Sequence, residues 1–170
     1  GETQPIEVRY RGQSSRFMSK KSWKLKFPSS APFEGRRDLN FKAHFMDSGL
    51  VHEPLTLDLL AGHGHPAVEH EPVHLIVNGR WRGVFDSVEQ IDEQYLLARD
   101  RDPGGSIYEC DGNFTLLPDL EDYVLHYEKK TNESTGYDDL IAFLELLDEV
   151  PTADLARELA AVFDVGDYLG

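Results

Sequence analysis

The sequence of 170 residues has very little cysteine and no long apolar run. Its single cysteine, Cys110, excludes an intramolecular disulfide framework and a zinc site built from several cysteines. No apolar stretch approaches the roughly 20 residues that a helix needs to cross a bilayer, so we expect no transmembrane segment. With 40% hydrophobic residues, the chain can bury one sizeable core or form two lobes around a cleft.

Positive charge is also scarce, because the formal net charge at pH 7 is −14. Such a molecule is a poor partner for nucleic acid or an anionic membrane surface, and we expect neither partner. The cations gather at the front: residues 1–42 hold ten Lys and Arg against four Asp and Glu, whereas residues 83–170 hold five against twenty-two. We therefore expect an anionic ligand at the front and a solvated surface on the acidic half.

Two amphipathic strands are expected in the front part of the chain. Residues 5–11 (PIEVRYR) and residues 22–27 (SWKLKF) alternate apolar side chains with polar or charged ones, as half-buried strands do. They are joined by a basic segment with Gly and Ser, RGQSSRFMSKK, whose composition is typical of a connection between strands. Residues 28–38 contain two prolines and a glycine and are expected to form a loop.

The middle of the chain predicts a helix followed by a hairpin. Leucines recur between residues 47 and 62, with Asp47 or Ser48 placed to cap the helix and Gly62 to end it. Asn78-Gly79 follows an apolar run and is the dipeptide best suited to a tight type I′ turn, because both residues tolerate positive φ.

The remaining residues predict short elements followed by helices. The expected elements are a helix capped by Asp92, a strand in SIYEC (106–110), and helical stretches near 119–128, 137–149 and 152–163. The stretch 137–149 has the clearest helical period, with Leu140, Ile141, Leu144 and Leu147 on one stripe. The fold class that these patterns predict is α+β, with an antiparallel sheet in front and helices behind.

Two segments carry a resemblance to a known family. RYRGQSSRFMSKKSWKLKF (9–27) is similar to the opening motif of the CotH kinase family, R-G-x-S-S followed by a K-K-S-aromatic-basic-aliphatic-K-F strand. VNGRWRGVFDSVEQID (77–92) resembles the N-G-x-x-x-G-V-aromatic hairpin of that family, with its acidic E-Q-I-D end. A looser similarity continues through GGSIYECDGN and TNESTGYDDLIAFLELLD to FDVGDYL, so the resemblance covers essentially the whole chain.

The resemblance implies a protein-kinase-like small lobe, with an antiparallel sheet and one helix, over residues 1–92. The helical start of a large lobe would follow over residues 93–170. It also implies an atypical, ATP-dependent protein kinase that acts on Ser/Thr of coat or secreted proteins, with ATP and Mg as cofactors. The Asn-x-Asp catalytic loop and the metal-binding Asp of that family are expected beyond Gly170, so no catalytic residue is expected within this sequence. The implied location is extracellular, at the cell surface or in the spore coat.

Phosphoryl transfer depends on backbone donors and cations around the phosphates, and the front segment offers both. In RGQSSR, Gly12 permits a close backbone approach, Ser14 and Ser15 supply hydroxyl groups, and Arg11 and Arg16 supply guanidinium groups suited to phosphate. We therefore expect Arg11, Gly12, Ser14 and Ser15 to bind nucleotide.

A phosphate-pairing lysine and its partner acid are also expected. Lys24 and Lys26 project from the strand face opposite Trp23, and Lys21 matches the family motif, but the sequence does not choose among these three lysines. The following helix offers Glu53 or Asp58 as the acid. Glu89 lies where the hairpin leads into the helical part, at the position where kinases seat adenine on backbone groups.

The sequence leaves alternatives to a nucleotide site. A non-catalytic coat or cell-surface scaffold is the principal alternative, because a kinase-like lobe can act as a scaffold for protein contacts without catalysing a reaction. A metal site is not expected from the spacing of His63, His65, His70 and His74. A polysaccharide-binding module would depend on exposed aromatic residues such as Trp23 and Trp81.

Overall fold

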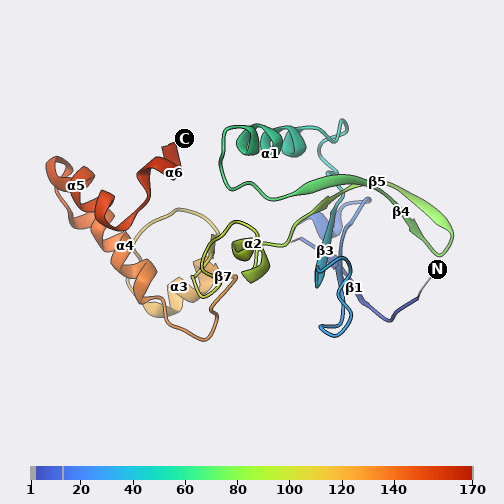
Figure 1. Cartoon of the computed structure of the whole chain (residues 1–170), viewed down its shortest axis with the longest axis horizontal. Helices are drawn as coiled ribbons and strands as arrows, with labels where there is room; N and C mark the ends of the chain where they lie inside the picture. Colours follow the sequence, from blue (N-terminus) through green and yellow to red (C-terminus); the bar gives the residue numbers. More distant parts are fainter. Residues whose placement is uncertain (1–2, 13, 170) are drawn as a thin grey trace. The chain divides into compact units, whose positions relative to one another are not determined.

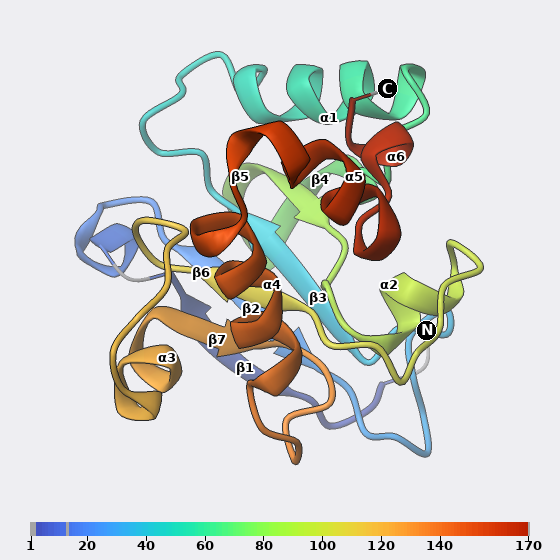
Figure 2. The same cartoon turned by 90° about the vertical axis from the view of Figure 1, so that its left-hand side faces the viewer.

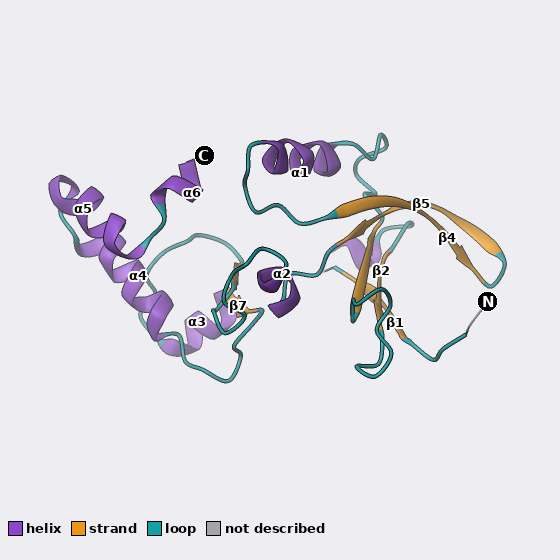
Figure 3. Cartoon of the chain, viewed as in Figure 1, coloured by secondary structure: helices purple, strands orange, loops and turns teal. Residues whose placement is uncertain are grey.

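The computed structural model describes residues 3–12 and 14–169, without the side chains of residues 14, 167 and 169. The chain divides into two compact units, Gly1–Tyr95 and Leu96–Gly170. Figure 3 shows that the long strands belong to the first unit and most of the helices to the second. The expected α+β class is therefore confirmed.

The first unit is built around a five-stranded antiparallel sheet (Figures 1 and 2). The strand order is β1-β2-β3-β5-β4, with α1 between β3 and β4 in the chain. This arrangement agrees with the expected kinase-like small lobe. The elements are β1 (Glu7–Arg11), the 3-10 helix η1 (Ser14–Phe17), β2 (Ser22–Lys26), β3 (Asp38–Lys42), α1 (His52–Gly62), β4 (His70–Val77) and β5 (Arg80–Val88). Helix α2 (Glu93–Leu97) follows β5.

The alternating sequence of β1 and β2 gives the sheet two chemically different faces. Tyr10 lies opposite Trp23 in the register, and the two rings meet edge to face with centroids 4.8 Å apart. Leu25 continues this apolar face and pairs with Leu39 of β3. Because successive side chains of a strand point to opposite faces, the charged residues between them lie on the other face.

The hairpin of β4 and β5 confirms its turn prediction. Asn78 and Gly79 have φ values of 53° and 72°, and they join the paired residues Val77 and Arg80. A two-residue loop of this kind requires positive φ at both positions, which Asn and Gly provide at low cost.

Two predictions for the first unit were incomplete. Strand β3 was not predicted, and Asp38, expected in the loop of residues 28–38, is its first residue. Helix α1 begins at His52, five residues after Asp47. Val51 occupies the N-cap position, but the predicted Asp47 carboxylate still accepts hydrogen bonds from the backbone N–H groups of Val51 and His52, both at 2.8 Å.

The second unit contains the predicted helical stripe. Leu140 and Leu144 are buried beside Tyr123 and Tyr127, and the other two residues of the stripe pack against this cluster. The elements are β6 (Tyr108–Cys110), α3 (Leu120–His126), β7 (Tyr127–Lys129), α4 (Asp138–Glu149), α5 (Thr152–Val162) and α6 (Val165–Leu169). Residues 127 and 128, predicted as helical, instead belong to β7, because Tyr127 pairs with Cys110 across a short ladder.

In the described part of the chain, every helix is either too short or too polar to serve as a membrane span.

Candidate functional site

A pocket of about 430 Å³ lies in the first unit at the edge of the sheet where β1 and β2 are connected. One wall comes from the basic connection, with Arg11, Gly12 and Ser15. The other wall comes from the end of β3 and the residues that follow it, including Lys42 and His44. The pocket therefore brings together cationic and hydroxyl groups from segments about 30 residues apart in sequence.

Gly12 gives the connection its tight form. Its φ is +94°, and a Cβ at this position would lie 1.9 Å from Oγ of Ser15, far inside contact distance. The Ser15 hydroxyl in turn donates a hydrogen bond of 3.4 Å to the carbonyl of Arg11. A side chain at position 12 would therefore displace the Ser15 hydroxyl, which belongs to the lining of the pocket.

Lys20 fastens this connection to the rest of the sheet. Its Nζ donates to the carbonyl oxygens of Ala43, at 2.9 Å, and Val84, at 2.6 Å. These carbonyls lie just beyond the last paired residues of β3 and β5, Lys42 and Asp86. Burial lowers the pKa of the Lys20 amine below its usual value. Lys20 thus lies where β3 and β5 separate, and it satisfies backbone acceptors there.

Lys42 forms an ion pair with Glu53 at the inner wall of the pocket. Lys42 is the last residue of β3, and its Nζ contacts Oε1 of Glu53 in the first turn of α1. About a third of each side chain is exposed, so the lysine is held in place yet remains accessible. Glu53 was one of the two acids that the sequence offered, but Lys42 was not among the predicted lysines.

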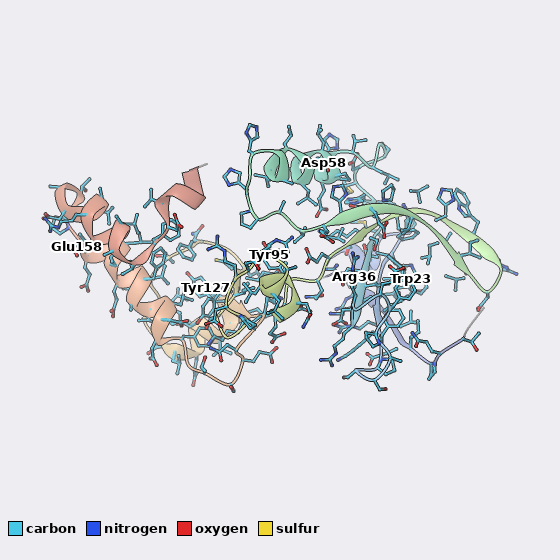
Figure 4. All side chains as sticks on the ribbon, in the orientation of Figure 1. Trp23, Arg36, Asp58, Tyr95, Tyr127 and Glu158 are labelled. Atoms are coloured by element: carbon cyan, nitrogen blue, oxygen red, sulfur yellow. The ribbon has the colours of Figure 1, made fainter. Side chains whose placement is uncertain are left out.

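His44 lies next to this pair and is surrounded by carboxylates. Its side chain is 7% exposed, with Nδ1 3.5 Å from Oε2 of Glu53 and Nε2 3.5 Å from Oδ2 of Asp86. The other oxygen of Asp86 lies 3.4 Å from Nδ1 of His70, and Nε2 of His70 lies 3.2 Å from Asp58 (labelled on α1 in Figure 4). Cationic or protonatable groups and carboxylates thus alternate from Lys42 to Asp58.

The predicted site residues fall into two groups. Arg11, Gly12 and Ser15 line the pocket, whereas the side chain of Ser14 lies outside the described part of the structure. Lys21 does not line the pocket: its Nζ donates to the carbonyls of Arg16 and Met18, within the connection itself.

The predicted residues of β2 and β5 lie elsewhere. Lys24 donates to Oε1 of Gln90 at 3.0 Å, and Lys26 is exposed at the end of its strand. Glu89 extends the pairing of β5, because its N–H donates to the carbonyl of Glu69 and its carboxylate accepts the Glu69 N–H. The structure does not bring these three side chains to the pocket.

The sequence also contained a weak signal for the residues that were missed. Asp86 lies within the hairpin motif, four residues before Gln90, and its partner in the register is Lys42. Only the presence of β3 between β2 and β5 places Lys42 beside the hairpin. If β3 had been predicted between β2 and β5, Lys42 at its end would have been identified as the lysine nearest to α1.

Two alternatives from the sequence can be compared with the structure. Among the described residues, no group of three or more His, Cys, Asp or Glu side chains is placed to hold a metal ion. Trp23 packs on Tyr10 in the sheet, whereas Trp81 is 65% exposed on the hairpin, so these two residues do not form one aromatic surface.

Two comparisons with known proteins point to one family. A family model described as CotH kinase protein matches residues 8–170. The inner spore coat protein H of Bacillus subtilis (strain 168) is 32% identical to this chain over a match of 171 residues. The match covers 96% of this chain and 47% of the relative. The chain therefore spans about half the length of that relative. A match over nearly the whole chain, together with this level of identity, shows that the chain belongs to the CotH kinase family.

Proposed function

We propose that the first unit binds the phosphates of ATP, with Mg²⁺, as part of a CotH-type protein kinase. The observation that carries this proposal is the ion pair between Lys42 and Glu53 beside the pocket. In protein kinases, a lysine of the third strand contacts the nucleotide phosphates and is held by a glutamate of the helix that follows. Lys42 of β3 and Glu53 of α1 have the same positions in the chain order.

The pocket is suited to a polyphosphate in size and in charge. Its volume of about 430 Å³ lies within the usual range for small-molecule sites. Arg11 and Lys42 bring cationic groups to the two walls, beside the apolar side chains of Met18, Phe45 and Met46. Asp47 also lines the pocket, but its carboxylate is directed to the N-terminus of α1. Guanidinium and ammonium groups are the side chains best suited to phosphate oxygens.

Magnesium would reach this unit together with the nucleotide. The described residues hold no cluster of metal-binding side chains, whereas Mg²⁺ in phosphotransferases is held partly by the phosphates themselves. The transfer that we propose is that of the γ-phosphoryl group to Ser/Thr of a coat or secreted protein. The similarity to an inner spore coat protein supports association with the spore coat.

Calorimetry with ATP and Mg²⁺ tests the binding proposal. We expect the wild-type chain to bind, and Lys42→Met to weaken binding by about tenfold or more, the value of one charge-assisted hydrogen bond. Lys26→Met is the matched control, because it removes an exposed lysine outside the pocket and should leave affinity unchanged. Absence of binding by the wild type at millimolar ATP would contradict the proposal and favour the scaffold alternative.

The transfer step is tested with the full-length protein. Incubation with radiolabelled ATP and coat proteins should label Ser or Thr, and the Lys42→Met substitution should abolish the label. Equal labelling by the two proteins would show that Lys42 has no part in the transfer.

A further inference from the structure

Charged side chains link helix α1 to the sheet. None of its residues, all of which the structure describes, is fully buried, and its apolar residues Pro54 and Leu57 are only partly covered. The ion pairs that join it to the sheet and the adjoining segment are Glu53 with Lys42, Glu53 with His44, and Asp58 with His70. Because a fully buried apolar face is what usually fixes a helix, we expect the position of α1 to depend on the charges of these groups.

His44 is the residue on which two of the carboxylates converge. Glu53 approaches its Nδ1 from α1, and Asp86 approaches its Nε2 from β5. The other charged or titratable groups that face this cluster are Lys42, which contacts Glu53, and His70, which contacts Asp86. Asp58 lies on the far side of His70.

The protonation state of His44 decides whether both contacts can form. A neutral imidazole has one N–H group and one lone pair, whereas an imidazolium has two N–H groups. Neutral His44 would therefore direct a lone pair at one of the two carboxylates. Nε2 of His44 and Oδ2 of Asp86 are both buried without a hydrogen-bond partner, although they lie 3.5 Å apart, which is the contact that a second proton would improve.

The backbone of His44 is a second, independent sign of constraint. Its φ is 45°, in the left-handed region that residues other than glycine rarely occupy. Unfavourable backbone conformations of this kind persist where the surrounding structure demands them, and they are frequent at functional sites. The ring of His44 lies between Glu53 and Asp86.

We propose that His44 is a positioning residue for the Lys42–Glu53 pair. As an imidazolium, it bridges Glu53 and Asp86 and fixes α1 on the sheet, and loss of its proton releases Glu53 and weakens nucleotide binding. The Lys42 contact uses Oε1 of Glu53 and the His44 contact uses Oε2, so both can exist together. Only the last step, on nucleotide affinity, rests on the proposed function.

The first test uses the protein without nucleotide. Nitrogen-15 NMR of the histidine rings follows the protonation of both His44 nitrogens across a pH series. Amide exchange in α1, corrected for its intrinsic pH dependence, should become about tenfold faster when His44 loses its second ring proton. His44→Gln should show fast exchange throughout the series, whereas His63→Gln, which removes an exposed histidine after α1, should behave as the wild type.

The second test compares ATP affinities of the wild type and His44→Gln at pH values below and above the point at which NMR shows His44 to lose its second ring proton. Their ratio cancels the titration of the nucleotide itself and should fall from about tenfold with His44 protonated to near one with His44 neutral. The inference would be overturned, even if ATP binds, by a pH-independent ratio of ATP affinities together with amide exchange in α1 that does not change when His44 loses its proton. If ATP does not bind at all, the proposed function fails, and the NMR and exchange results alone decide the role of His44.

Discussion

Lys24 and Asp38 lie 3.4 Å apart on the polar face of the sheet, with only 17% of each side chain exposed. Lys24 also donates to Gln90, whose Oε1 accepts a second hydrogen bond from the buried Asn40. A lysine engaged in this way is part of the folded structure of the first unit. Its place opposite the apolar face was predictable, but its partners were not.

Lys24→Met is therefore expected to act on stability. The substitution removes the cation beside a buried oxygen of Asp38 and should lower the free energy of unfolding by about 1–3 kcal/mol. Urea unfolding followed by tryptophan fluorescence reports on the first unit, because both tryptophans lie within it. Lys26→Met should change this free energy by less than about 0.5 kcal/mol, as surface substitutions usually do.

Gly12→Ala tests the shape of the basic connection. Gly35 is the matched control, because its φ of +80° resembles the +94° of Gly12 but no atom lies within 4 Å of its Cβ position. Both substitutions should cost about 1–2 kcal/mol in unfolding free energy for the left-handed backbone. Only Gly12→Ala should also weaken ATP binding, by about tenfold, because it displaces Ser15. Equal ATP affinities in the two variants would show that the basic connection is not part of the ATP-binding site.

The sequence predicted the local parts of this fold well. The turn at Asn78-Gly79 depends on two adjacent residues, and the stripe of Leu140 and Leu144 depends on a helical period within one segment. Such signals need no knowledge of distant residues. The capping role of Asp47 was predictable for the same reason, although a turn at residues 48 and 49 separates Asp47 from the start of α1.

The nonlocal parts could not be predicted in the same way. Strand β3 has only five residues, and its buried Asn40 and its terminal Lys42 interrupt the apolar pattern. The value of Lys42 for the site arises from its pairing with Asp86 and from the fold of α1 onto the sheet. These relationships depend on sheet order, which neighbouring residues do not encode.

The pH dependence of α1 should reveal the cap at Asp47. The hydrogen bond from the His52 N–H is the largest cause that lowers the pKa of this carboxyl group, from 3.8 to about 2. Since the folded pKa lies below the unfolded value, the stabilisation is complete above about pH 4 and is lost as the pH falls towards 2. Backbone chemical shifts of residues 52–55 should therefore lose helical character over this interval.

Two substitutions separate the charge of Asp47 from its capping role. Asp47→Asn keeps an oxygen acceptor but does not titrate, so the change between pH 4 and pH 2 should disappear. Asp47→Ala removes the acceptor, and amide exchange in the first turn of α1 should become about fivefold faster at pH 7. A wild-type titration that persists in Asp47→Asn would assign the effect to another carboxyl group.

The second unit offers a separate test at Tyr108, whose hydroxyl donates a hydrogen bond to Oδ1 of Asp139. Burial raises the pKa of Tyr108 above its usual value, and Asp139 adds to this effect. Burial alone would raise the pKa of Asp139, but the hydrogen bonds from Tyr108 and from the Leu140 N–H lower it. Tyr108→Phe should therefore lower the free energy of unfolding by about 1–2 kcal/mol at pH 7. Because the folded pKa of Asp139 is depressed, this difference should shrink as the pH falls below about 4, when the carboxylate is protonated.

Urea unfolding followed by tyrosine circular dichroism at pH 7 and pH 3 measures both values of the Tyr108→Phe difference, with the exposed Tyr168→Phe as control. A loss of equal size at the two pH values would show that the Tyr108 hydroxyl stabilises this unit independently of the charge on Asp139.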